Sequence, residues 1–127
     1  MLNTTIWLFA PELNPTRVRG FGMMTTTDRL AGALVDLVAA HGCSAGFTGV
    51  ELTRDGPLDL AADAEEQYRQ LLEAVRACER RGAEAVIVAG GPLSETARRL
   101  RETVDVTIVE PVPAACALVR ARVYGVL

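Results

Sequence analysis

The chain alternates between short runs that are apolar at every position and longer segments with helical spacing of apolar residues. Continuous apolar runs occur at residues 5–10 and 85–89, and a strand is also expected at residues 104–109. Such runs are typical of strands buried on both faces of a parallel sheet. A further strand is expected over residues 43–52, although Gly46 and Gly49 interrupt it. The apolar end at residues 123–127 is a candidate for a fifth strand.

Apolar residues repeat every three or four positions between these runs, which predicts four helices. The helices are expected over residues 27–41, 60–81, 94–102 and 114–123. The apolar stripe of the first helix, which is expected to face the core, is Leu30, Leu34, Leu37 and Val38. Thr27 and Ser94 are candidate N-caps, and Asp63 with Glu66 has the spacing of a capping box. Residues 11–26 are expected to be a long loop because they hold two prolines and two glycines.

Strands that alternate with helices predict a parallel sheet covered on both faces. The expected fold is α/β: a flavodoxin-like, doubly wound parallel sheet of four to five strands in a three-layer αβα arrangement. A length of 127 residues fits one domain, 1–127, and the sequence contains no internal repeat.

Ligands of doubly wound sheets bind beyond the carboxyl ends of the strands. That rule selects the connections at residues 11–26, 53–57, 90–94 and 110–113. Gly90, Gly91 and Ser94 join a strand to a helix N-terminus, where backbone N–H groups and the helix dipole favour an anion. The alternative is a tight turn in which Ser94 only caps the helix.

The other candidate residues are polar groups near the same strand ends. Asn14, Thr16 and Arg17 suit recognition of a small carboxylate, and Thr25 and Thr26 add hydroxyl groups.

Glu12 and Glu110 are the candidate catalytic residues, as general acid or base, with solvation or pairing to arginine as the alternative for Glu110. Phe21, Met23 and Met24 are unusually apolar for a loop and are expected to be core or interface residues rather than a lid.

Composition excludes several chemistries. The 13 basic residues are all arginine, so no lysine is present to form a Schiff base or a P-loop. A single histidine, His41, and three cysteines without CxxC spacing give no support for a metal site. Cys43, Cys78 and Cys116 are expected to be small buried hydrophobes.

Charge and hydropathy bound the partners and the location. A net charge of −3 argues against nucleic acid as the main partner. No apolar run reaches 18 residues and the first residues lack a basic signal-peptide segment, so no membrane association and a cytoplasmic location are expected.

Residues 56–127 resemble the first domain of the aspartate/glutamate racemase superfamily, most closely the hydantoin racemases. The matching stretches are Gly56-Pro57, 70–75, 82–89 and 104–111, and 6–16 is similar to the family's first strand with its Asn-Pro-Asn-Thr loop. The resemblance implies two flavodoxin-like domains with the active site between them, and one cysteine from each domain as acid and base. Gly90 stands where the first of these cysteines would follow the third strand.

The resemblance implies a cofactor-independent enzyme that moves a proton through an enol- or enolate-like state on a small carboxylate or carbonyl compound. Isomerisation, decarboxylation and cyclisation share that chemistry. Because one domain is present, a homodimer is expected to complete the site. The alternative is a non-catalytic, degenerate racemase-like domain that binds a small ligand or a partner protein. Cobalamin binding is set aside because its Asp-x-His-x-x-Gly motif is absent, and flavin binding rests on fold analogy alone.

Overall fold

The computed structural model describes residues 20–89 and 93–125. Four strands and five helices alternate along these residues. They are β1 (Phe21–Thr25), α2 (Asp28–Ala40), β2 (Phe47–Leu52), α3 (Pro57–Ala61), α4 (Ala64–Arg80), β3 (Ala85–Val88), α5 (Ser94–Thr103), β4 (Thr107–Val109) and α6 (Pro111–Tyr124).

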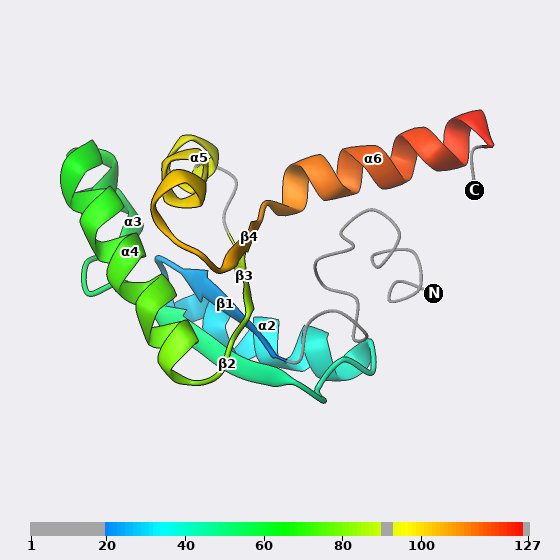
Figure 1. The fold of residues 1–127 in the computed structure, drawn as a ribbon, viewed down its shortest axis with the longest axis horizontal. Coiled ribbons are helices and arrows are strands. Elements are labelled where there is room, and N and C mark those ends of the chain that lie inside the picture. The colour runs from blue at the N-terminus through cyan, green and yellow to red at the C-terminus, as the bar shows by residue number, and fades with distance from the viewer. Residues whose placement is uncertain (1–19, 90–92, 126–127) are drawn as a thin grey trace.

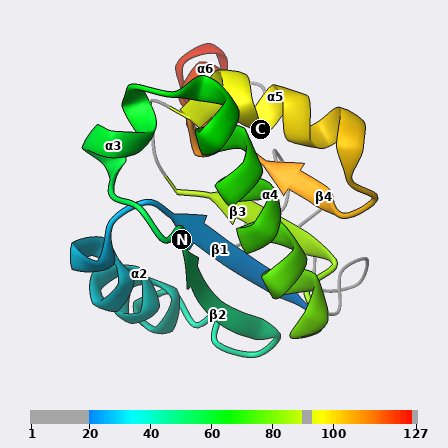
Figure 2. The same ribbon diagram turned by 90° about the vertical axis from the view of Figure 1, so that its left-hand side faces the viewer.

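The four strands form one parallel sheet in the order β2-β1-β3-β4. Helices α4 and α5 cover one face and α2 covers the other, so the described residues make three layers (Figures 1 and 2). This arrangement confirms the expected α/β doubly wound class with a four-stranded sheet. Among the described residues, no helix combines the length and the apolar character needed to cross a bilayer.

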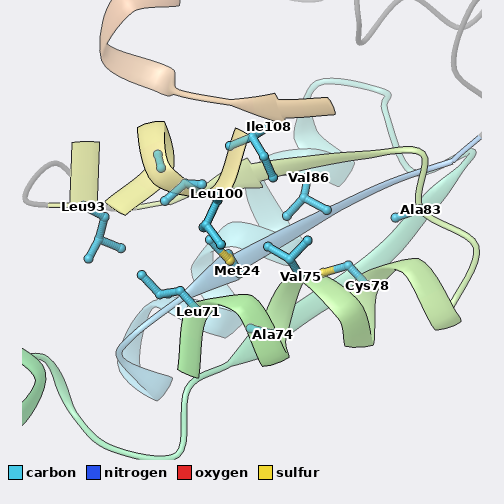
Figure 3. Packing of buried hydrophobic residues seen from close by; sticks show 12 residues of the cluster. Met24, Leu71, Ala74, Val75, Cys78, Ala83, Val86, Leu93, Leu100 and Ile108 are labelled. Atoms are coloured by element: carbon cyan, nitrogen blue, oxygen red, sulfur yellow. The ribbon is translucent and has the colours of Figure 1, made fainter. Parts of the chain in front are cut away.

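The larger part of the core lies between the sheet and helices α4 and α5 (Figure 3). Met24 of β1 and Val86 of β3 pack there against Leu71 and Val75 of α4 and Leu100 of α5, all of which are buried. A smaller cluster on the opposite face joins sheet residues to one buried residue of α2, Val38. The hydrophobic stabilisation of the described chain is therefore concentrated on the α4–α5 face.

Strand β1 corrects the predicted loop over residues 11–26. Residues 21–25 are buried throughout and pair with β2 and β3, so they are one of the two inner strands of the sheet. Gly22 favours a loop when only the sequence is considered. In the structure, glycine is required because neighbouring side chains leave no room for a Cβ atom. A Cβ atom at this position would lie 2.7 Å from Thr48 Oγ1 and 3.1 Å from Cys78 Sγ. The strand predicted at residues 5–10 lies outside the described residues, and Phe21, Met23 and Met24 are core residues as expected.

Several predicted boundaries change. The helix predicted over residues 60–81 is two helices, α3 and α4, with Asp63 between them as the N-cap of α4. Its carboxylate accepts hydrogen bonds from the backbone N–H groups of Glu65 and Glu66, which stabilises the new helix start. Strands β2 and β4 are shorter than predicted, and α5 begins at Ser94 with Leu93 in the N-cap position.

The chain end differs from the prediction as well. Helix α6 begins at Pro111 and includes Val123 and Tyr124, so these two residues do not begin a fifth strand. Gly125 ends α6 in the left-handed conformation, with φ of +66°. Figure 1 shows α6 extending away from the end of β4.

The apolar stripe predicted for α2 is only partly buried. Val38 is buried, Leu34 is half-buried, and Leu30 and Leu37 are 45% and 50% exposed. The predicted helical period is correct, but within the described residues the sheet covers only one edge of that stripe.

We predict that Gly22→Ala destabilises the fold by about 1–3 kcal/mol, because a methyl group overfills the space between Thr48 and Cys78. The matched control is Gly32→Ala in α2, where nothing lies within 4 Å of the added atom. That substitution is expected to stabilise the protein by about 0.5–1 kcal/mol, since alanine favours a helix interior. Urea unfolding measures both, and equal effects at the two positions would contradict this account of β1.

Candidate functional site

The four parallel strands end at one edge of the sheet, which we call the carboxyl edge. Its described residues are Thr25 at the end of β1, Thr26 and Thr27 after it, Thr53 after β2, Ala89 after β3 and Glu110 after β4. Adjacent strands lie about 4.8 Å apart, so the ends of β1 and β4, separated by β3, are roughly 10 Å apart. That span fits a small molecule.

Thr25 fixes the middle of the carboxyl edge. Its side chain is 1% exposed, and its hydroxyl donates a hydrogen bond to the carbonyl oxygen of Ala89 over 2.9 Å. The backbone adds two bonds, from Ala89 N–H to the Met24 carbonyl and from Thr53 N–H to the Thr25 carbonyl. The ends of three strands are therefore held together by polar contacts rather than by packing alone.

Thr26 has a different environment from Thr25. It is half-buried, and its hydroxyl makes no hydrogen bond with any described residue. Thr27 is the N-cap residue of α2, yet its side chain forms no capping hydrogen bond. Two hydroxyl groups beside the end of β1 are thus without a partner in the described part of the chain.

Gln70 of α4 fixes the β2 side of the carboxyl edge. The residue is 2% exposed and uses both ends of its amide. Its Oε1 accepts from the Asp55 N–H over 3.0 Å, while its Nε2 donates to Asp55 Oδ2 over 2.6 Å and to Glu66 Oε1 over 2.7 Å. Thr53, which is also buried, donates its hydroxyl to the Asp55 carbonyl over 2.8 Å. One amide therefore holds the turn after β2.

Arginines surround this network on the solvent side. Arg69 hydrogen-bonds to Glu66, and Arg54 lies 3.6 Å from the same carboxylate and 3.8 Å from that of Glu73. The hydrogen bonds from Gln70 and then Arg69 lower the pKa of Glu66 below its ordinary value.

Arg101 of α5 fixes the β4 side. Its guanidinium donates from Nε and Nη2 to the Ile108 carbonyl, each over 3.2 Å, and its Nη1 lies 3.2 Å from Glu110 Oε2. The Glu110 side chain is 12% exposed, so the ion pair holds this carboxylate in a partly enclosed position. The interpretation of Glu110 as paired to arginine is therefore correct, and its partner is Arg101.

The described thiols do not gather at the carboxyl edge. Cys43 lies between α2 and β2, on the side where the strands begin. Cys78 is buried beneath the first half of β1, and burial raises the pKa of its thiol from 9.0 to about 12. Cys116 is exposed on α6, which corrects the expectation that all three cysteines are buried. Among the described residues, no three or more His, Cys, Asp or Glu side chains group as metal ligands.

The predicted site residues divide into two groups. Thr25, Thr26 and Glu110 lie at the carboxyl edge, and Ser94 begins α5 after β3. The others lie outside the described residues: Glu12, Asn14, Thr16, Arg17, Gly90 and Gly91. Prediction from the sequence missed Gln70 and Arg101. The one signal for Gln70 was a polar residue placed between apolar positions of an amphipathic helix.

Comparisons with known proteins agree with this architecture. The family model described as Asp/Glu/Hydantoin racemase matches residues 12–119. No curated protein matches the sequence. Two similar solved structures are allantoin racemases, and at 18% and 20% identity they show the shared fold alone.

Both superpositions cover nearly all of this chain and about half of the racemase. The allantoin racemase from Pseudomonas fluorescens superposes with a TM-score of 0.77 over 95% of this chain and 52% of its own. The allantoin racemase from Klebsiella pneumoniae gives a TM-score of 0.75 over 94% of this chain and 50% of its own. The chain therefore spans about half the length of the racemases that it matches.

We predict that Gln70→Glu destabilises the fold by about 2–4 kcal/mol at pH 7, because a third carboxylate then faces those of Asp55 and Glu66. The loss relative to wild type shrinks toward pH 4, where the introduced carboxyl group is protonated and donates a hydrogen bond again. The control is Gln67→Glu, which keeps the oxygen that accepts from the Thr96 hydroxyl over 2.6 Å. Its expected change is within about 0.5 kcal/mol. Chemical unfolding at pH 7 and pH 4 measures both variants. A loss of stability in Gln70→Glu that is the same at both pH values would contradict the proposed hydrogen bonds of Gln70.

We predict that Cys116 reacts with a disulfide reagent at pH 8 in the folded protein, whereas Cys78 reacts only on unfolding. The variants Cys43→Ala/Cys78→Ala and Cys43→Ala/Cys116→Ala isolate each thiol. Because the pKa of Cys78 is raised, the stability that its burial contributes is present below pH 9 and lost as the pH rises toward 12. Fast labelling of Cys78 in the folded state at pH 8 would refute this.

Proposed function

The chain belongs to the Asp/Glu/hydantoin racemase family, and from that premise we propose that it catalyses proton transfer next to a carbonyl or carboxylate group. The single observation that carries the proposal is the family match over residues 12–119, which spans all four strands whose ends form the carboxyl edge. The substrate is a small carboxylate or carbonyl compound, and the hydantoin-like ring named by the family falls within that class.

The reaction we propose takes a proton from the carbon beside the carbonyl group. The electron pair of the broken C–H bond moves into an enol- or enolate-like state, and the proton then returns to the same carbon on either face. Negative charge grows on the carbonyl oxygen, so hydrogen-bond donors placed in advance lower the barrier. Isomerisation follows directly, and loss of carbon dioxide from a dicarboxylate passes through the same state.

The described residues offer two of the required parts. Thr26 carries a hydroxyl without a partner among the described residues, and we assign it to substrate binding together with Ser94. Glu110 carries a carboxylate whose position is set by Arg101, and we assign it as a base.

Six further residues complete the proposed site, and the structure does not describe them. The backbone N–H groups of Gly90 and Gly91 are proposed to bind the negative charge of the substrate. Asn14, Thr16 and Arg17 are proposed to bind the carboxylate of the substrate, because amide, hydroxyl and guanidinium groups all donate hydrogen bonds to it. Glu12 is proposed to act as a second acid or base.

The site that we propose is shared. The family resemblance implies an active site enclosed between two α/β units, and the described residues form one such unit. We propose that a second copy of the chain provides that unit, with the two carboxyl edges facing each other.

Two observations favour a second function. The described thiols lie away from the carboxyl edge or point to solvent, and the one described candidate base is held in an ion pair. A non-catalytic member of the family that binds a small ligand or a partner protein would have the same features.

We predict loss of α-proton signals when the protein is mixed in D2O with a panel of amino acids, hydantoins including allantoin, malonates and keto acids. Proton NMR measures the exchange and identifies the substrate class. Line broadening of a ligand without proton exchange would favour the second function, a non-catalytic protein that binds a small ligand. Neither signal across the panel would overturn the proposal.

For a substrate found in this way, Glu110→Gln is expected to lower kcat by about 10²–10⁴-fold because the base is lost. Thr26→Val is expected to raise KM about tenfold, because it removes a hydroxyl proposed to bind the substrate. That hydroxyl makes no hydrogen bond with any described residue. The control is Glu79→Gln, an exposed residue of α4 at the end far from the carboxyl edge. Wild-type activity in both site variants would exclude these two roles.

A further inference from the structure

Thr25 carries a buried hydroxyl outside the groups assigned to the proposed chemistry. Its side chain is 1% exposed, and its Oγ1 lies 2.9 Å from the carbonyl oxygen of Ala89. A threonine hydroxyl has one proton to donate, and here the Ala89 carbonyl accepts it. The hydroxyl of Thr25 therefore has no proton left for a substrate, although the next residue, Thr26, is assigned to substrate binding.

This hydrogen bond lies one residue beyond the last pair of β1 and β3. The register of the two strands ends with Met24 opposite Val88. Beyond that pair, Ala89 donates its backbone N–H to the Met24 carbonyl over 2.8 Å and accepts from the Thr25 hydroxyl. A side chain thereby continues the attachment of β3 to β1 up to the point where β3 leaves the sheet.

The backbone of Thr25 makes a similar attachment on the side of β2. Its carbonyl oxygen accepts from the Thr53 N–H over 3.2 Å. Thr53 is buried, and its hydroxyl donates to the carbonyl of Asp55, which is bonded in turn to Gln70. Thr25 therefore holds the ends of both neighbouring strands in fixed positions relative to Thr26.

We propose that Thr25 is a positioning residue for the proposed proton transfer, on which this inference rests. Its hydroxyl fixes the end of β3, which lies between β1 and β4. Strand β3 therefore sets the distance of roughly 10 Å between Thr26 and the assigned base, Glu110. A displacement of about 1 Å is enough to slow a reaction about a hundredfold, because the reacting groups no longer align.

The hydrogen bond also affects the electrostatics of the carboxyl edge. A carbonyl oxygen carries partial negative charge, and the proposed enolate-like state develops further negative charge near the same strand ends. By donating to the Ala89 carbonyl, the Thr25 hydroxyl reduces the repulsion between this oxygen and that charge. Alignment and charge both act on the transition state more than on the bound substrate, so the loss of the hydroxyl lowers kcat rather than raising KM.

The experiment compares Thr25→Ser with Thr25→Ala. Both substitutions remove the same methyl group, and only Thr25→Ala also removes the hydroxyl. For a substrate found in the α-proton exchange assay, Thr25→Ala is expected to lower kcat about 10–100-fold relative to Thr25→Ser, with KM within about threefold. Thr25→Ser is expected to keep kcat within about threefold of wild type, since its hydroxyl still donates to Ala89.

The control is the same pair of substitutions at Thr48. Its hydroxyl also donates to a backbone carbonyl, that of Phe21 over 3.3 Å, but at the edge of the sheet where the strands begin. Thr48→Ser and Thr48→Ala are expected to differ in kcat by less than about threefold. Circular dichroism and urea unfolding of all four variants separate a loss of stability from a loss of activity.

Hydrogen exchange at the Ala89 amide gives a readout that needs no substrate. This N–H is bonded to the Met24 carbonyl, so its exchange rate reports how firmly the end of β3 is attached to β1. Thr25→Ala is expected to exchange this proton at least about tenfold faster than Thr25→Ser. Equal rates would overturn the proposal. If Thr25→Ala does not fold, Thr25→Val, which removes the donor at nearly constant volume, replaces it in both measurements with wild type as the reference.

The outcomes distinguish this proposal from the proposed function. A wild-type chain that exchanges α-protons, with equal kcat in Thr25→Ala and Thr25→Ser, contradicts the positioning role and leaves the proposed function. An equal loss of kcat in Thr48→Ala also contradicts the positioning role, because the effect is then not specific to the carboxyl edge. A wild-type chain that exchanges no α-proton contradicts the proposed function, and the inference that rests on it is then wrong as well.

Discussion

The burial of β1 between β2 and β3 is the constraint on which the rest of the structure depends. Every residue of this five-residue strand is buried, and it pairs on both sides. The close packing works because Gly22 leaves room for Thr48 and Cys78, which approach from β2 and α4. The same burial raises the pKa of the Cys78 thiol and makes this cysteine a core residue rather than a reactive group. The strand therefore determines both where the core lies and where Thr25 meets the neighbouring strand ends.

Side chains fix the carboxyl edge at three points, each where a strand ends. Thr25 bonds to the carbonyl after β3, Gln70 holds the turn after β2, and Arg101 holds the end of β4 with Glu110. Two of these side chains come from α4 and α5, the helices that cover the larger core. The packing of these helices on one face of the sheet therefore also positions the carboxyl edge. A site built on such supports is set before a ligand arrives, as stabilisation of a developing charge requires.

The sequence predicted the class of fold because the spacing of hydrophobic residues and the residues that begin and end helices are local properties. The helices α2, α4, α5 and α6 were found, and Asp63 was found as a helix start, since caps depend on neighbouring residues. The sequence did not predict strand β1, because glycine is needed at position 22 only to make room for side chains from distant elements. The same holds for the contact of Gln70 with Asp55, 15 residues away, and for the contacts of Arg101, 7–9 residues away, because these groups become neighbours only in the folded chain.

The roles at the carboxyl edge were predicted from residue type and strand position, and they stay predictions. Shift mapping tests most directly the central claim that this edge is the ligand site. Backbone amide signals of labelled protein are followed by NMR while a malonate, a keto acid or a hydantoin is added. The account predicts that Thr25, Thr26, Thr53, Ala89 and Glu110 shift together, with little change at residues 43–46 and 82–84, where strands begin. Shifts confined to those strand starts, or none with any ligand, would contradict it.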